Sequence, residues 1–171
     1  MVFSDLFFLF VFLPLFLLCY MTAAAIDRAF SPAVGEKKFM AKNLTLVLFS
    51  LVFYAWGEPV YVFLMLGCVL LNYLAGLVID RQERYRKLAL VVGLACNIGI
   101  LCCFKYLGFL AQTLCDVGVP VMVPKISLPI GISFYTFQSI SYLIDVYRRQ
   151  SPVQKRFLNL LLYISMFPQL I

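Results

Sequence analysis

The sequence lacks histidine altogether and is poor in charge, since Asp, Glu, Lys and Arg make up only 13% of its 171 residues. Histidine is the side chain whose unperturbed pKa lies near neutral pH, so acid–base chemistry would require another group or another part of a longer protein. An ordinary soluble domain is about 25% charged and about 45–50% apolar, whereas 64% of this chain is apolar. The composition excludes such a domain and indicates the lipid bilayer as the solvent.

Common catalytic and metal-binding motifs are also missing. The sequence has no glycine-rich phosphate loop, no nucleophile elbow and no paired-carboxylate motif, so no catalytic constellation is visible in it. No two cysteines form a C-x-x-C pair, and no histidine is present to complete a zinc or haem site. We expect no metal, and we expect the cysteines to be small apolar residues, most of them within helices. They are Cys19, Cys68, Cys96, Cys102, Cys103 and Cys115.

Long apolar runs dominate the chain. About 20 helical residues cross a hydrocarbon core about 30 Å thick, and runs of this length recur. Pro14 lies within the first run and predicts a kink there. Residues 111–125 include one glycine and two prolines and predict a loop or a short interfacial piece. The sequence therefore predicts an all-α, polytopic transmembrane helical bundle with five complete spans and a partial sixth, at residues 3–26, 39–56, 59–79, 88–110 and 126–146, and then 157–171.

Basic residues cluster in alternate connections between these runs. Lys and Arg are enriched in the short cytoplasmic loops of membrane proteins, so the pattern places the N-terminus outside. The net charge of +6 then reflects topology, and we expect no nucleic-acid partner. The counts of Lys and Arg are four in each of 27–42, 80–87 and 147–156, none in 57–58, and one, Lys125, in 111–125.

The fifth run carries a polar stripe, interrupted by Phe134, in which five polar side chains share an arc of about 120°. The stripe either lines a polar cavity or substrate path, or makes hydrogen bonds between packed helices. Asp145 is expected to pair with Arg148 or Arg149, one turn further on. The stripe consists of Tyr135, Gln138, Ser141, Tyr142 and Asp145. The opposite side, which suits lipid or apolar packing, consists of Ile132, Thr136, Phe137, Ile140, Leu143 and Ile144.

Three polar residues lie within the other runs. Asn72 and Asn97 occupy the third and fourth runs, where a polar amide most simply bonds to a neighbouring helix. Lys105 lies five residues from the end of the fourth run and is expected to extend its amine to the interface.

Several stretches resemble one protein family. The run LPIGISFYTFQSISYLIDVYR at 128–148 resembles the signature of the membrane-bound O-acyltransferase family, in its bacterial polysaccharide branch. Further stretches agree in order: MVFSDLFFLF with FLPLFL, FSLVFYAWGEP with NYLAG, FKYLGF, and the final MFPQLI. The resemblance covers nearly the whole chain and implies that residues 1–171 form the N-terminal part of one multi-span domain.

The resemblance also implies a function. Members of this family are helical proteins that move an acyl group, usually from a donor on the cytoplasmic side, to an acceptor hydroxyl. It implies an enzyme of the bacterial cytoplasmic membrane that acetylates an exported polysaccharide such as alginate, with an acyl carrier as donor, no bound cofactor, and acetylation and export proteins as partners. The family's general base is a histidine in a later helix. No residue of this chain takes that role, so we expect no catalytic residue here and no activity of the chain alone.

The resemblance assigns the signature helix to the scaffold around the catalytic funnel. A complete, non-catalytic membrane scaffold or transporter subunit is an alternative, and so is a teichoic-acid D-alanyl transferase of the same family. The signature positions are Pro129, Gly131, Ser133, Phe134, Tyr135, Gln138, Ser139, Tyr142, Asp145 and Arg148.

Overall fold

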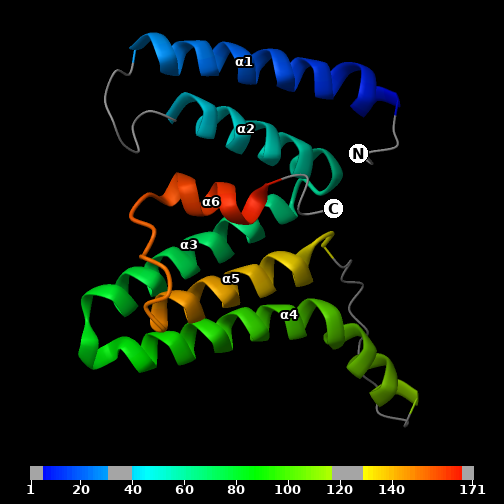
Figure 1. Ribbon diagram of the computed structural model, residues 1–171. Coiled ribbons are helices and arrows are strands. Elements are labelled where there is room, and N and C mark those ends of the chain that lie inside the picture. Colours follow the sequence, from blue (N-terminus) through cyan, green and yellow to red (C-terminus); the bar gives the residue numbers. More distant parts are fainter. Residues whose placement is uncertain (1–5, 31–39, 117–128, 167–171) are drawn as a thin grey trace.

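The computed structural model describes residues 6–30, 40–116 and 129–166, and all the regular elements in these ranges are helical (Figure 1). A helix satisfies its backbone polar groups internally, as lipid requires. The expectation of an all-α fold is confirmed. The elements are η1 (Phe8–Phe12, a π-helix), α1 (Leu13–Phe30), α2 (Met40–Gly57), α3 (Tyr61–Arg81), η3 (Glu83–Tyr85, a 3₁₀ turn), α4 (Arg86–Asp116), α5 (Ile132–Tyr147) and α6 (Phe157–Ser165).

Four helical segments are long and apolar enough to cross a membrane, and they correspond to the first four predicted spans. Two elements are shorter. Helix α5 has 16 residues and α6 has nine, so α5 is about 24 Å long at 1.5 Å per residue, less than the hydrocarbon core. The fifth complete span, the partial sixth and the orientation of the N-terminus therefore stay predictions. The four segments are Phe8–Ala29, Met40–Gly57, Tyr61–Arg81 and Glu83–Tyr106.

Helix α4 corrects part of the predicted loop at 111–125. The helix continues to Asp116 and extends beyond the other helices (Figure 1). Residues 111–116 contain no glycine or proline, and the first helix breaker, Gly118, comes only after them. The rest of the predicted loop, with Lys125, lies outside the described residues.

The irregularity expected at Pro14 takes the form of a π-helical turn. Proline lacks a backbone N–H, and its ring clashes with the carbonyl four residues earlier, here that of Phe10. In η1 the bonds span five residues, and the N–H of Leu13 donates to the carbonyl oxygen of Phe8. Such a turn is an established cause of helix bending.

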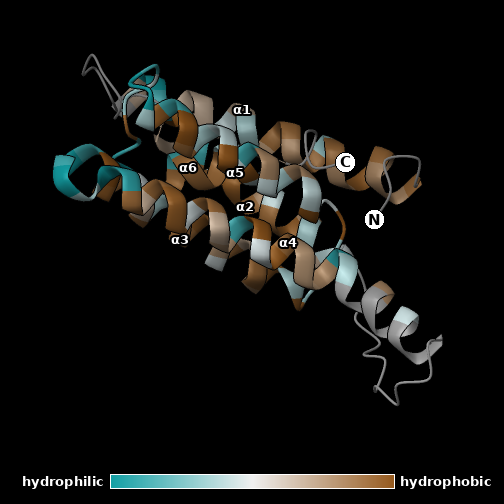
Figure 2. Ribbon diagram, turned by 90° about the horizontal axis from the view of Figure 1, so that it is seen from below, coloured by the Kyte–Doolittle hydropathy of each residue, from teal (hydrophilic) through white to brown (hydrophobic). Residues whose placement is uncertain are grey.

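The helices form a bundle with α1 at one edge and α4 at the other (Figure 1). Helices α3, α4 and α5 pack against one another, and α6 lies against α2 and α3. Helix α1 packs against α2 and against η1, which precedes it, and makes no other extensive contact within the described chain. The end of α1, the start of α2, the α3–α4 connection and the α5–α6 connection share one end of the bundle, where Figure 2 shows hydrophilic ribbon. The alternation of basic segments along the sequence therefore corresponds to one end of the bundle.

Close packing of α5 depends on two glycines. An added Cβ at Gly76 of α3 would lie 2.8 Å from the Tyr142 hydroxyl, and one at Gly93 of α4 would lie 2.7 Å from Leu143 Cδ1. Real Cβ atoms essentially never approach so closely. Helix α5 therefore reaches its depth in the bundle because these two positions carry no side chain.

The described cysteines occur in α1, α3 and α4 and form no disulfides. Their placement within helices agrees with the sequence expectation, and the side chain of Cys115 lies outside the described ones. They are Cys19, Cys68, Cys96, Cys102 and Cys103.

Candidate functional site

A polar cavity of about 290 Å³ lies between the end of α5 and α6. Tyr142 and Asp145 face it from α5, and Asn159 and Tyr163 face it from α6. Each pair is three or four residues apart, so both members lie on one helix face. Gln154, from the connection between the helices, also lines the cavity. A neutral or cationic ligand with hydrogen-bond donors suits this set of hydroxyl, amide and carboxylate oxygens.

Tyr142 is held in place from two sides. Its ring and hydroxyl fill the space left by Gly76, and its hydroxyl oxygen accepts a hydrogen bond of 3.2 Å from the backbone N–H of Gln154. The hydroxyl hydrogen stays available to donate. Packing and this hydrogen bond fix the orientation of a side chain that lines the cavity.

Gln138 lies one turn deeper on α5 and connects it to α6. Its Nε2 donates a hydrogen bond of 2.6 Å to the carbonyl oxygen of Tyr163. Its Oε1 is buried and has no partner among the described residues, and the same holds for the hydroxyls of Ser139 and Ser165. A buried polar atom without a partner costs about 1–3 kcal/mol and indicates an ordered water or a ligand. The region between α5 and α6 thus has hydrogen-bonding capacity that the described chain does not satisfy.

The predicted stripe divides into three groups in the structure. Tyr135, Gln138 and Tyr142 are buried within the bundle, Asp145 is half-buried at the cavity, and Ser141 is exposed and does not line it. Both interpretations of the stripe therefore have support, since Gln138 bonds to another helix whereas Tyr142 and Asp145 line a cavity. That the stripe contacts substrate stays a prediction.

The opposite side of α5 divides between packing and exposure. Ile132, Thr136 and Leu143 are buried, whereas Phe137 is 61% exposed. Both environments, apolar packing and an outward surface, were expected for this side.

The predicted pairing of Asp145 with Arg148 or Arg149 is wrong. Arg149 instead forms an ion pair with Glu83 of η3, and no arginine or lysine of the described chain pairs with Asp145. Arg149 has a φ of 59°, because the chain turns sharply after α5 ends at Tyr147. This turn directs the arginine toward η3 and leaves the Asp145 carboxylate without an ion pair at the cavity.

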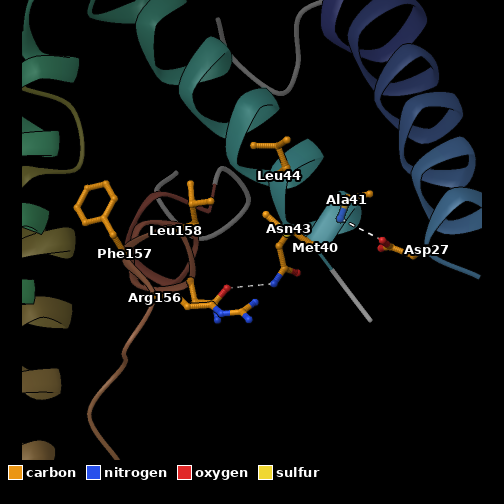
Figure 3. Close-up of a pocket in the computed structure, with 9 residues that line it drawn as sticks. Asp27, Met40, Ala41, Asn43, Leu44, Arg156, Phe157 and Leu158 are labelled. Carbon is orange, nitrogen blue, oxygen red and sulfur yellow. Dashed lines mark hydrogen bonds between the residues drawn. The ribbon is translucent and has the colours of Figure 1, made fainter. Parts of the chain in front are cut away.

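A second, larger cavity of about 790 Å³ lies on the other side of α6 (Figure 3). Asn43 of α2 donates a hydrogen bond of 3.2 Å to Oδ1 of Asn159, whose Nδ2 donates one of 3.4 Å to Oε1 of Gln154. Asn159 lines both cavities and connects the start of α2 to the chain before α6.

Asp27 forms the far wall of this second cavity and fixes the start of α2. Its two carboxylate oxygens accept hydrogen bonds of 3.1 Å from the backbone N–H groups of Ala41 and Lys42. A carboxylate at a helix N-terminus is favoured by both the free N–H groups and the helix dipole. The side chain is only 7% exposed.

Sequence reasoning missed these polar contacts. Asp27, Asn43 and Asn159 are single polar residues in segments interpreted only for hydropathy and charge. Their partners lie up to 116 positions away along the chain, so no periodic pattern could indicate them. Within the described residues, no three acidic or cysteine side chains are grouped so as to hold a metal ion.

The remaining signature positions flank the start and end of α5. Pro129 is buried, and Gly131 precedes the helix with a φ of 77°, a conformation that favours glycine. Ser133 is half-buried, whereas Phe134 and Arg148 are exposed. Only Tyr142 and Asp145 of the signature line the 290 Å³ cavity.

Comparison with known proteins finds bacterial O-acetylases that are similar to the chain. The chain is 37% identical over its whole length to the probable alginate O-acetylase AlgI of Pseudomonas aeruginosa and 39% identical to that of Azotobacter vinelandii. It is 30% identical, over 92% of its length, to the peptidoglycan O-acetyltransferase of Helicobacter pylori. It spans about a third of the length of each of these relatives, 32%, 33% and 35% respectively.

No family model and no solved structure matches the chain. The full-length similarity to named O-acetylases agrees with the resemblance carried by the signature helix. Along all or nearly all of its length the chain is similar to these bacterial O-acetylases, in agreement with its resemblance to the membrane-bound O-acyltransferase family.

Proposed function

We propose that these 171 residues are part of a membrane-embedded O-acetyltransferase that acts on hydroxyl groups of an exported polysaccharide such as alginate. The proposal is supported by relatives named for O-acetylation that match the chain along its whole length. These relatives give no support to a non-catalytic scaffold or to a D-alanyl transferase.

The observation that carries a role for this part of the enzyme is the polar cavity between α5 and α6. Tyr142 and Asp145 of the signature helix line it, and one turn deeper lies the Oε1 of Gln138, which has no partner among the described residues. Residues of one helix thus provide both a polar surface and unused hydrogen-bonding capacity. In this proposal the cavity positions a reactant, and the general base is a histidine outside these 171 residues.

The cavity opens at the end of the bundle that carries the basic connections. If this end is cytoplasmic, as the positive-inside rule predicts, the cavity faces the side from which an acyl carrier would deliver its acetyl group. Acetylation and export proteins would then complete transfer to the polymer on the other side, and the chain alone would be inactive.

The test uses the longer protein that contains these residues, expressed in cells that lack their own polysaccharide acetylase. Tyr142→Phe and Gln138→Leu should lower the acetyl content of the polymer by about tenfold, which corresponds to about 1.4 kcal/mol in the transition state. Ser141→Ala, at the exposed position of the same stripe, should leave it unchanged. Acetyl groups are counted by NMR on both exopolysaccharide and peptidoglycan, with the amount of protein in the membrane measured in parallel.

The outcomes separate the parts of the proposal. Normal acetylation by both the Tyr142 variant, at the cavity, and the Gln138 variant, one turn deeper, would refute the role of this region. Absence of acetyl transfer to either polymer by the unaltered protein would refute the transferase function, and acetylated peptidoglycan alone would refute the exported polysaccharide as acceptor.

A further inference from the structure

An apolar groove of about 340 Å³ runs along η1, α1 and α2, and it shares no lining residue with the two polar cavities. Its walls are exposed side chains spaced four residues apart on each helix, and no polar side chain lines it. The walls are Phe7, Val11 and Leu15 on one side and Leu48, Val52 and Trp56 on the other.

The floor of the groove is a set of packed aromatic rings. Phe12 lies between Phe49 and Phe53, with ring centroids 5.5 and 5.6 Å apart, and Phe8 meets Phe53 edge-on at 5.6 Å. Phe12 and Phe53 are buried beneath the walls. Offset and edge-to-face aromatic pairs are each worth about 0.5–1.5 kcal/mol beyond the area they bury, so these ring contacts stabilise the floor of the groove.

One end of the groove is marked by Trp56. Its ring stacks on that of Phe7 with centroids 5.7 Å apart, and it lies at the end of α2, beside the connection to α3. Tryptophan is enriched at the membrane–water interface. The groove therefore begins at the level of the headgroups and runs toward the middle of the bilayer.

The length of the groove matches one leaflet. Its wall residues are separated by eight residue steps from first to last along each helix, which is about 12 Å at 1.5 Å per residue. Half of a hydrocarbon core about 30 Å thick is about 15 Å. Helix α1 packs extensively only against α2 and η1 within the described chain, so the groove lies at the edge of this bundle.

From these observations we propose that the α1–α2 groove binds one acyl chain of a phospholipid in the leaflet on the Trp56 side. The chain lies along the aromatic floor, with the headgroup beside Trp56. Binding comes from van der Waals contact with an apolar surface, since lipid tails and the groove are equally apolar. The site is separate from the acetyl-transfer function and does not depend on it.

Trp56 provides the measurement, because it is the only tryptophan in the sequence. The purified chain is titrated in detergent with a phospholipid brominated along one acyl chain, which quenches tryptophan fluorescence on contact. The expected result is saturable quenching that reaches completion at one lipid per protein and is reversed by the same lipid without bromine. Val52→Phe, which fills the groove, should abolish the saturable phase.

Two controls make the result specific. Leu70→Phe adds the same bulk to an exposed position of α3 outside the groove and should leave the titration unchanged. Moving the tryptophan to an exposed site on α3, with Trp56→Phe and Phe63→Trp, should give quenching that rises only in proportion to lipid in the micelle. Equal, non-saturating quenching at both positions would overturn the proposal.

Two other possible occupants of the groove, a second copy of the chain and another helix of the longer protein, are distinguished by measuring mass. A dimer of the chain that Val52→Phe dissociates would show that a second copy covers the groove. For the longer protein, the same titration is carried out and native mass spectrometry measures the number of lipid molecules retained per protein. Failure of Val52→Phe to change retained lipid there would show that another helix covers this face.

Discussion

The side-chain amides of Asn72 and Asn97 bond to each other in both directions across the α3–α4 interface. Each Nδ2 donates to the partner's Oδ1, at 3.1 and 2.8 Å, and each also donates at 2.7 Å to a carbonyl oxygen one turn back on its own helix. Both side chains are buried. The pair satisfies two polar groups and fixes the register of two membrane helices, as the sequence led us to expect.

Removing one amide should leave the Oδ1 of the other without its donor, while its Nδ2 keeps the bond to its own helix. We expect Asn72→Leu or Asn97→Leu to lower the free energy of unfolding by about 1–2 kcal/mol, since interhelical hydrogen bonds are modest but a buried amide oxygen without a donor adds a penalty. The double variant should be more stable than the sum of the two single losses predicts. Unfolding in mixed micelles measures this, and strictly additive losses would show that the two amides do not interact.

Substitutions at four helical glycines should give contrasting results. Gly76→Ala and Gly93→Ala should destabilise the bundle by about 1–3 kcal/mol, because α5 must shift or Tyr142 and Leu143 must leave their rotamers. Gly67→Ala and Gly99→Ala place the new Cβ in open space and should be neutral or stabilising, by up to about 1 kcal/mol. Thermal unfolding of the four variants tests the depth of α5, and equal effects at all four would contradict it.

The carboxylate of Asp27 should stabilise the start of α2. Asp27→Ala removes both of its hydrogen bonds to the helix and should cost about 0.5–2 kcal/mol. Asp80→Asn changes an exposed carboxylate and serves as the control. Hydrogen exchange at Ala41 and Lys42 is the direct readout, and unchanged protection there would contradict the capping contact.

The ion pair of Arg149 and Glu83 should contribute little to stability. Both side chains are largely exposed, 69% and 80%, and such pairs are worth about 0–1 kcal/mol. Glu83→Gln should therefore change the unfolding free energy by less than about 1 kcal/mol, and by less at high salt. A larger loss would indicate that the pair is shielded from solvent in the membrane.

Orientation is tested with single cysteines in a cysteine-free background. By the positive-inside rule, Gln82→Cys, in the basic α3–α4 connection, should resist an impermeant thiol reagent in intact cells and react after lysis. Glu58→Cys, in the α2–α3 connection without basic residues, should react in intact cells. The reverse pattern would place the N-terminus inside.

The apolar runs alone predict the helical class and the first four spans correctly, because a bilayer sets helix length and forbids unpaired backbone groups. The positions of glycine and proline are less informative about where helices end. Gly118 and Pro120 suggest a loop from 111, yet α4 continues to Asp116, since breakers limit a helix only close to where they stand. Pro14 correctly indicates an irregular turn, whose π-helical form is seen only in the structure.

The candidate site was visible in part. The arc of α5 contains Tyr142 and Asp145, which line one cavity in the structure, because helical periodicity depends on spacing alone. Helical periodicity does not show which part of an arc is covered by another helix, so the predicted arc included Ser141, which is exposed. The prediction also paired Asp145 with an arginine, Arg149, that pairs with Glu83 in the structure.

What the sequence determined by itself was the solvent, the helices and the resemblance to known O-acetylases, since hydropathy, length and ordered motifs all lie along one chain. Only the tertiary structure decided that Asn159 lines two cavities, that Gly76 admits Tyr142, and that α1 and α2 form an apolar groove. These features depend on side chains from helices distant in the sequence, and their contacts arise from packing geometry that no local pattern contains.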